Sequence, residues 1–467
     1  MERSEILREI AAYCQLAGLA ESTFGRRAVN DGKLVARIRD GGRISEHTLE
    51  RIRGYIGSNP PAPPSDRDAV IRPKGAARTR AAMPAADRNG PGAAGHETNF
   101  RFFDNRQKYL LFVSTCSEKW RIAERVTMEL ANLHPRPPAL RLFDAGVGDG
   151  TVLARVMRAT HSRFSTMPFY IVGKEISLED IRLTLDKMPD RLFEHPATVL
   201  VVTNLYYSEA PWLTTNSTTA AGSFVWKEQA LRGNSAHEFE QQIVELQPFL
   251  AENWQARIGK SGNPIYERPC VLVLYREDHK FLLDPIIPRL GATRAEFDLV
   301  VASQPYRARA SAQFKARKVI APLARALGSG GRLIGIHSRG DDPGMEIIHR
   351  IWPDDHPFRT DRHAILKAVK HELGSHARHF NFNAYSDARS IFQYDMHTLP
   401  NEVSSAIGTS TLLAAWNAAI YVAQVEEERL EEATRDGRYV EASREVLRER
   451  GGLWFNDESY VISRKRD

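Results

Sequence analysis

The sequence predicts an α/β protein with a doubly wound sheet, preceded by a small all-α domain and a flexible linker. Apolar strands alternate with helical runs from residue 140 onwards, which is typical of a parallel sheet. Residues 1–57 instead show only helical periodicity, and the composition changes sharply after Gly57. We therefore divide the 467 residues into domains at 1–57 and 99–467, joined by a linker at 58–98.

The first 57 residues have the periodicity of four short amphipathic helices. Their apolar positions include Ile6, Ile10, Tyr13, Phe24, Ala28, Leu34, Val35, Ile38, Leu49, Ile52 and Ile56. Residues 18–41 resemble the lambda-repressor-like helix-turn-helix, whose second helix enters the major groove of DNA. The resemblance implies that DNA is a partner, contacted through Ser22, Thr23, Asp31, Lys33 and Arg37. A helical module that binds another protein is the alternative interpretation.

The linker is predicted from composition. Residues 58–98 contain seven prolines, ten alanines and four glycines but hardly any large apolar residues, so they cannot bury enough surface to fold. The formal charge is +2 in each of 1–57, 58–98 and 99–467. The basic pI of about 9.1 therefore does not come from one strong patch, and charge alone does not indicate nucleic-acid binding.

A glycine-rich turn follows the first predicted strand of the larger domain. Residues 140–150 read Leu-Arg-Leu-Phe-Asp-Ala-Gly-Val-Gly-Asp-Gly, and a helical run begins at Thr151. Gly146 and Gly148 allow the backbone to approach a ligand, and the free amides of the next helix point toward it. Thr151 stands where the dinucleotide pattern has its last glycine, so the turn differs from that pattern. A tight turn without a ligand would explain the same glycines.

Two further predicted strands end in polar residues. Glu175 follows strand 169–172, where its carboxylate could accept hydrogen bonds from both hydroxyls of a ribose. Strand 198–202 ends close to Asn204. With the glycine turn, this order resembles the class I S-adenosylmethionine (SAM) methyltransferases, which have a Rossmann-like sheet. The resemblance implies SAM as cofactor, bound by Asp144, Ala145, Gly146, Gly148, Asp149, Glu175 and Asn204.

The strand at 297–303 leads into Ser303-Gln304-Pro305-Tyr306, which resembles motif IV of methyltransferases that modify planar nitrogens. The resemblance implies that these four residues are catalytic, because acceptors and an aromatic face must aim the lone pair of a conjugated amine at the methyl group. Gln304 departs from the apolar residue usual in that family, and Ser303 is a weaker acceptor than Asp or Asn. A simple strand-end turn with proline is the alternative.

The remaining segments complete the expected domain. A helical stretch to Leu327, a turn at Gly330-Gly331 and a strand to Ile336 form the second half of the sheet. Residues 214–268 are an expected insertion with a helix over 228–254, followed by an extra strand at 269–275. Residues 100–133 are expected to pack over the cofactor, and 453–462 to form the last strand. The spacing of His371, Glu372 and His376 does not fit a zinc helix, so no metal is predicted.

Composition also limits the compartment and the partners. The three cysteines are widely scattered, the longest apolar run is too short for a bilayer, and no leader-like sequence opens the chain. We expect a cytoplasmic protein without a membrane partner, and a homodimer stays open. The sequence thus predicts a SAM-dependent methyltransferase, with adenine N6 as the first acceptor considered. The alternative is a transcriptional regulator whose methyltransferase-like domain senses SAM, or methylates a small molecule or protein.

Overall fold

The computed structural model describes residues 3–17, 21–29, 31–39, 46–59, 106–259, 264–397 and 407–466. The chain separates into two compact units, Met1–Ala93 and Ala94–Asp467. Most of the predicted linker at 58–98 lies outside the described residues.

The first unit contains four helices where the periodicity predicts them: α1 (Arg3–Ala17), α2 (Glu21–Val29), α3 (Leu34–Arg39) and α4 (Glu46–Ser58). Their apolar faces meet in one core that includes Ile10, Phe24 and Leu34. Gly25 is required where α2 meets the next segment, because a Cβ there would lie 2.3 Å from the backbone oxygen of Asp31. The absence of a side chain at Gly25 therefore permits this close backbone contact.

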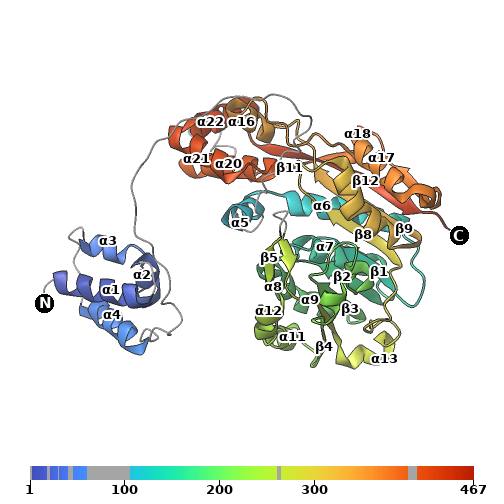
Figure 1. Cartoon of the computed structure of the whole chain (residues 1–467), viewed down its shortest axis with the longest axis horizontal. Coiled ribbons are helices and arrows are strands. Elements are labelled where there is room, and N and C mark those ends of the chain that lie inside the picture. The colour runs from blue at the N-terminus through green and yellow to red at the C-terminus, as the bar shows by residue number, and fades with distance from the viewer. Residues whose placement is uncertain are drawn as a thin grey trace, which may run out of the picture. The chain divides into compact units, whose positions relative to one another are not determined.

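The second unit is built on a ten-stranded sheet of order β10-β12-β9-β8-β1-β2-β3-β7-β4, with β11 paired to β12 (Figure 1). Strands β1, β2, β3, β8 and β9 run parallel, whereas β7 is antiparallel to β3 and β12 is antiparallel to β9. The predicted α/β sheet, mostly parallel at its centre, is therefore present. The strands are β1 (Leu140–Asp144), β2 (Phe169–Lys174), β3 (Thr198–Thr203), β4 (Val225–Leu231), β7 (Cys270–Arg276), β8 (Phe297–Ser303), β9 (Leu327–Ser338), β10 (Phe380–Asn383), β11 (Ile391–Asp395) and β12 (Trp454–Arg464).

Side chains of the central strands alternate between two apolar cores, as strand geometry requires. On β1, Leu142 belongs to one core and Phe143 to the other. The Leu142 core is covered by α6 (Glu118–Thr127), α7 (Thr151–Arg163), α8 (Leu178–Asp186) and α9 (Met188–Glu194). The Phe143 core is covered by α15 (Ala321–Arg325) and α17 (Arg362–Leu373). The sheet is thus the middle layer of three, which fixes the positions of its strand ends.

A third apolar cluster joins helices that lie beyond the sheet. It includes side chains of five helices: α5 (Arg106–Thr115), α16 (Pro343–Ile351), α20 (Thr409–Ala423), α21 (Glu427–Asp436) and α22 (Arg438–Arg450). Figure 1 shows α16, α20, α21 and α22 grouped together above the sheet, with α5 beneath them. The C-terminal helices and the segment before β1 therefore form one body.

The predicted insertion contains a strand that the sequence prediction assigned to a helix. Residues 225–231 form β4, which pairs with β7, so the expected helix over 228–254 is wrong for 228–231. Two helices follow, α11 (Ala236–Val244) and α12 (Gln247–Asn253). The reason is local: Ser235 and Glu238 form a capping box that starts α11 at Ala236, and pairing with β7 satisfies the backbone before it. The extra strand and the last strand are confirmed as β7 and β12.

The Gly330-Gly331 turn lies within β9 rather than before it. The preceding helix ends at Arg325 and β9 starts at Leu327, so helix to Leu327 is wrong by two residues. The pairing of β8 with β9 changes register between Phe297 and Leu299. Gly330 has φ +77°, and a Cβ on Gly331 would lie 2.3 Å from the Phe297 oxygen, so the glycines make this irregularity possible.

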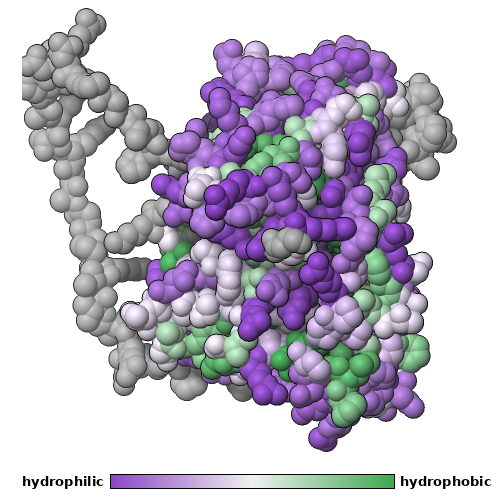
Figure 2. Space-filling model, turned by 90° about the vertical axis from the view of Figure 1, so that its right-hand side faces the viewer, coloured by the Kyte–Doolittle hydropathy of each residue, from purple (hydrophilic) through white to green (hydrophobic). Residues whose placement is uncertain are grey.

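Figure 2 shows the face that lies on the right-hand side in Figure 1. This face is largely hydrophilic, with apolar side chains toward its lower end. Among the exposed apolar side chains, Phe281 of α13 (Lys280–Leu283) is 98% exposed. In the described part of the chain, no helix has the length and apolar character needed to cross a membrane.

Candidate functional site

The centre of the sheet has a topological switch point between β1 and β8. The chain proceeds from β1 to β2 and β3 on one side, and later from β8 to β9 on the other. Loops that leave adjacent parallel strands in opposite directions open a crevice at their carboxyl ends, the usual ligand position in such sheets. The glycine turn follows β1 and Ser303–Tyr306 follow β8, so both predicted segments lie at this end of the sheet, on neighbouring strands.

The glycine turn is tight but leaves space on one side. Gly148 has φ +56° and Gly150 has φ +80°, which disfavour residues with a Cβ. A Cβ on Gly150 would lie 2.8 Å from the Cα of Thr184 in α8, so this third glycine is needed for packing. Beside Gly146, the nearest atom to an added Cβ is the Ser303 oxygen at 3.9 Å. A Cβ on Gly146 would thus make only an ordinary contact, with the end of β8.

The two aspartates of the turn mainly organise its backbone. Buried Asp144 accepts a hydrogen bond from the Gly146 amide at 3.1 Å, and burial raises the pKa of Asp144 to about 6. Asp149 accepts hydrogen bonds from the amide and hydroxyl of Thr151 at 3.3 and 2.5 Å. Burial opposes ionisation of Asp149. The hydrogen bond from the Thr151 hydroxyl and the ammonium groups of Lys119 and Lys187 outweigh this effect, so the pKa of Asp149 is lowered overall. These contacts fix the start of α7.

Glu175 links the glycine turn to the next helix. One carboxylate oxygen accepts from the Gly148 amide at 2.9 Å, and the other accepts from the Ile176 and Ser177 amides at 2.7 and 2.9 Å. Burial raises the pKa of the Glu175 carboxyl. Trp254, which follows α12 in the insertion, donates to the Glu175 backbone oxygen at 3.0 Å. The carboxylate therefore lies at the turn, and its predicted ribose contact stays a prediction.

The side chain of Asn204 is used within the sheet. Its amide nitrogen donates to the Arg268 oxygen at 2.9 Å, and its oxygen accepts from the Cys270 amide at 2.8 Å. The residue thus joins the end of β3 to the start of β7, and these bonds occupy both ends of its amide group. The predicted cofactor role of Asn204 is untested by this arrangement.

Gln304 occupies a strained backbone conformation at the end of β8. Its φ is +47°, which is rare for a residue with a Cβ and marks a position that the surrounding structure must hold. Its amide nitrogen donates to the Ser338 hydroxyl at 3.0 Å and to Asp457 at 3.3 Å. Burial raises the pKa of Asp457 well above its usual range. Gln304, which departs from the motif, is thus held by Ser338 at the end of β9 and by Asp457 near the start of β12.

The Tyr306 ring is buried rather than open to the crevice. Its hydroxyl is 3.2 Å from the Tyr460 hydroxyl, and the Lys315 ammonium lies 4.9 Å from the ring centroid. Burial lowers the pKa of Lys315 to about 8. Pro305 contributes its backbone oxygen, which accepts from the Tyr207 hydroxyl at 2.8 Å. Of the four predicted catalytic residues, Ser303 has its backbone oxygen beside the glycine turn, 3.9 Å from the position of a Cβ on Gly146.

The segment before β1 covers the glycine turn, as expected for residues 100–133. The Tyr109 hydroxyl of α5 lies 3.4 Å from the position of a Cβ on Gly148. The Lys119 ammonium of α6 lies 5.7 Å from the Tyr109 ring centroid and 3.6 Å from a Glu118 carboxylate oxygen. The Tyr421 ring of α20 is 6.0 Å from that of Tyr109. The sequence predicts this position for the segment that contains Tyr109 and Lys119, but no motif assigns either residue a role, and nothing in the sequence marks Tyr421.

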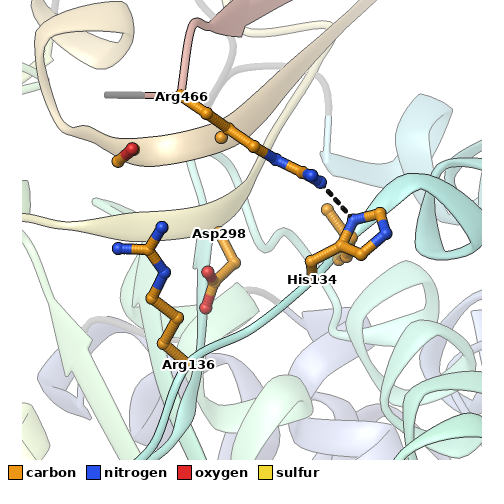
Figure 3. A pocket seen from close by; sticks show the side chains of 7 residues that line it. His134, Arg136, Asp298 and Arg466 are labelled. Carbon is orange, nitrogen blue, oxygen red and sulfur yellow. Dashed lines mark hydrogen bonds between the residues drawn. The ribbon is translucent and has the colours of Figure 1, made fainter.

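A small pocket lies at the opposite edge of the sheet, near the start of β8. It is lined by Leu133, His134, Arg136, Asp298, Ser329, Gly330 and Arg466 (Figure 3). Arg466 donates to His134 at 2.5 Å, and the Asp298 carboxylate accepts from the Arg141 amide at 2.8 Å. The carboxyl end of β8 carries Ser303, so this pocket is separate from the crevice.

Several predicted DNA-contacting residues surround the start of α3. Asp31 accepts from the Lys33 amide at 2.9 Å and forms an ion pair with Arg37 at 2.8 Å. Lys33 and Arg37 are exposed, and Thr23 is half-buried in α2. The Ser22 side chain lies outside the described part of the structure. The basic side chains are thus accessible, and their contact with DNA stays a prediction.

Comparisons with known proteins returned no matching family model and no matching curated protein. Solved structures with similarity include a geranyl diphosphate methyltransferase in complex with GPP and sinefungin (13% identity over 73% of this chain and 76% of that chain, TM-score 0.29). Others are a putative sarcosine dimethylglycine methyltransferase from Galdieria sulphuraria (9%, 74% and 85%, 0.27) and an rRNA methyltransferase from Streptomyces viridochromogenes (14%, 47% and 74%, 0.19).

Proposed function

We propose that the chain is a SAM-dependent methyltransferase with the cofactor bound in the crevice between β1 and β8. The observation that supports this most is the position of the glycine turn at the topological switch point, directly beside the end of β8. Without the edge strands β4 and β7, the order β10-β12-β9-β8-β1-β2-β3 is that of class I methyltransferase sheets. This order agrees with the family that the sequence motifs resemble.

The residues of the crevice suit SAM in shape and in donors. Gly146 leaves open space above the turn, and the helix α7 starts directly behind it with its N-terminus toward the site. Glu175 stands at the end of β2 with its carboxylate on the turn, within the region where a ribose would lie. When bound, SAM supplies an activated methyl group on a sulfonium.

The chain itself would then contribute positioning and exclusion of water. The glycine turn and Glu175 hold the cofactor, and Tyr109 closes the turn from above. Asp457 and Ser338 hold Gln304 in its left-handed conformation, so the loop after β8 has one fixed course. A fixed loop can hold an acceptor in line with the methyl group, and such positioning supplies much of the catalysis of a transfer whose donor is already activated.

For the acceptor we propose a planar nitrogen, with adenine N6 as the first candidate and the N-terminal unit as the DNA-binding module. The support is the Ser303–Tyr306 segment at the crevice, together with exposed Lys33 directly before α3 and exposed Arg37 on α3. A base would have to be flipped from the duplex to enter. The proposal requires a face of Tyr306 to become accessible on acceptor binding.

The burial of Tyr306 favours a second candidate. With Lys315 over its ring, Tyr306 stabilises the domain without contacting an acceptor, as expected of a regulator that senses SAM or methylates a small molecule or protein. The two candidates differ in the product that they form.

One experiment distinguishes the two candidate functions. The full chain is incubated with methyl-labelled SAM and with separated fractions of DNA, RNA, protein and metabolites. Label in duplex DNA at adenine N6 supports the first candidate, and label in metabolites or protein supports the second. Transfer to DNA should fall at least about tenfold in Tyr306→Ala, roughly 1.4 kcal/mol of barrier, while SAM affinity is retained. SAM binding without transfer to any fraction would leave only the sensing role.

A further inference from the structure

The strongest unassigned feature of the crevice is the Glu118–Lys119 pair over the glycine turn. Both residues lie in the first turn of α6, which packs on α7. Glu118 is buried, and the Lys119 side chain is 20% exposed. Lys119 reaches the turn beside Tyr109, whose hydroxyl is the nearest atom to a Cβ on Gly148. A lysine side chain that keeps some exposure therefore lies next to the backbone that is expected to face the cofactor.

The charges around the turn are predominantly acidic. Asp144 and Asp149 both experience the Lys119 charge, which favours their ionised forms. Lys187 also lies near Asp149, but its ammonium donates to the backbone oxygens of Asp149 and Leu183 at 2.6 and 3.3 Å. Lys119, like Lys187 beside Asp149, has a carboxylate oxygen at 3.6 Å, longer than a direct charge-assisted hydrogen bond. Unlike the Lys187 ammonium, the Lys119 ammonium lies over an aromatic ring, that of Tyr109, with 5.7 Å to its centroid. Its ammonium thus retains donors for a further anionic group.

We propose that Lys119 binds the α-carboxylate at the amino-acid end of the cofactor, with Glu118 orienting its ammonium. This inference rests on the proposed function, since it assigns one end of SAM to one side chain. A carboxylate placed among Asp144, Asp149 and Glu118 would be repelled without a cation, and Lys119 supplies that cation over the turn. The residue therefore selects ligands with an amino-acid end over the nucleoside alone.

Two product-like ligands isolate this contact. S-adenosylhomocysteine has the α-carboxylate, whereas 5′-methylthioadenosine keeps the nucleoside and the sulfur but lacks the amino acid. Calorimetric titrations of the full chain should show that Lys119→Met weakens S-adenosylhomocysteine binding by roughly ten- to hundredfold, the usual range for a lost hydrogen bond to a charged group. Binding of 5′-methylthioadenosine should change by less than about twofold, since it makes no contact with the ammonium.

Lys119→Arg keeps the positive charge and should restore most of the S-adenosylhomocysteine affinity. The matched control is Arg121→Met on the same helix, because Arg121 is exposed and pairs with Glu124 at 3.0 Å away from the turn. That variant should bind both ligands like the wild type. Thermal unfolding of each variant verifies that the chain is folded.

The possible failures are distinguishable. Equal losses for both ligands in Lys119→Met, or no loss for either, would overturn the role of Lys119 while the cofactor site stands. Binding of neither ligand to the wild-type chain would overturn the proposed function together with this inference.

Discussion

Replacement of Gly150 by alanine tests whether the tight turn depends on its contact with α8. Two costs are expected: the left-handed backbone at φ +80° costs an alanine about 1–2 kcal/mol, and the Cβ would lie 2.8 Å from the Thr184 Cα. Relief of such an overlap requires backbone shifts worth about 1–3 kcal/mol. Gly150→Ala should therefore lower the free energy of unfolding by about 2–5 kcal/mol.

Gly437→Ala is the matched control. Gly437 has a similar φ of +72°, but no atom lies within 4 Å of an added Cβ. The control should show only the backbone cost, and both alanines restrict the unfolded chain equally. The difference between the variants therefore reports the Thr184 contact, and it should be about 1–3 kcal/mol in urea unfolding followed by circular dichroism. Equal destabilisation of the two variants would refute the packing argument.

Three further predictions concern a buried carboxyl group, a contact between two tyrosine hydroxyls, and DNA binding. Burial raises the pKa of Asp144 to about 6, above its unfolded value near 3.9, so its stabilising contribution is complete below pH 4 and is lost as the pH rises through about 6. Asp144→Asn should therefore gain stability relative to wild type between pH 4.5 and 7.5 in urea unfolding, and a constant difference would contradict the raised pKa. Tyr306→Phe should cost about 0.5–1.5 kcal/mol through the lost Tyr460 hydroxyl contact, and thermal unfolding without any change would show that contact to be unimportant. Lys33→Ala and Arg37→Ala should weaken binding to a specific DNA site more than to random DNA in gel shifts over a salt series, and absence of wild-type binding at low salt would indicate a protein-interaction module.

Much of the fold could be predicted from the sequence because the signals are local. The central strands follow from apolar runs that end in a glycine turn or in polar residues, and β1, β2, β3, β7, β8 and β12 lie where the sequence predicts them. Residues 225–231 form a strand only because β7 lies beside them, so their long-range pairing could not be found by periodicity. The sequence likewise predicts the Gly330-Gly331 turn outside β9, because the pairing with β8 that includes this turn in the strand is also a long-range contact.

The candidate site was less predictable than the sheet. Motifs identify the ends of β1, β2 and β8, but they do not show where side chains from distant elements arrive. Lys119 and Tyr109 precede the first motif, and Asp457 belongs to the last strand, yet all three lie around the crevice. The use of Asn204 between β3 and β7 is equally invisible in the sequence, because it depends on a strand that begins 66 residues later.

The most direct test of the central claim is a calorimetric titration of S-adenosylhomocysteine into the full chain and into Gly148→Val. Valine at φ +56° would place a branched side chain between the turn and Tyr109, in the space that the cofactor requires. Gly437→Val, with a similar backbone strain and open surroundings, is the control for stability alone. We expect binding to the wild type and to Gly437→Val and none to a folded Gly148→Val, whereas unchanged affinity in Gly148→Val would place the ligand away from the glycine turn.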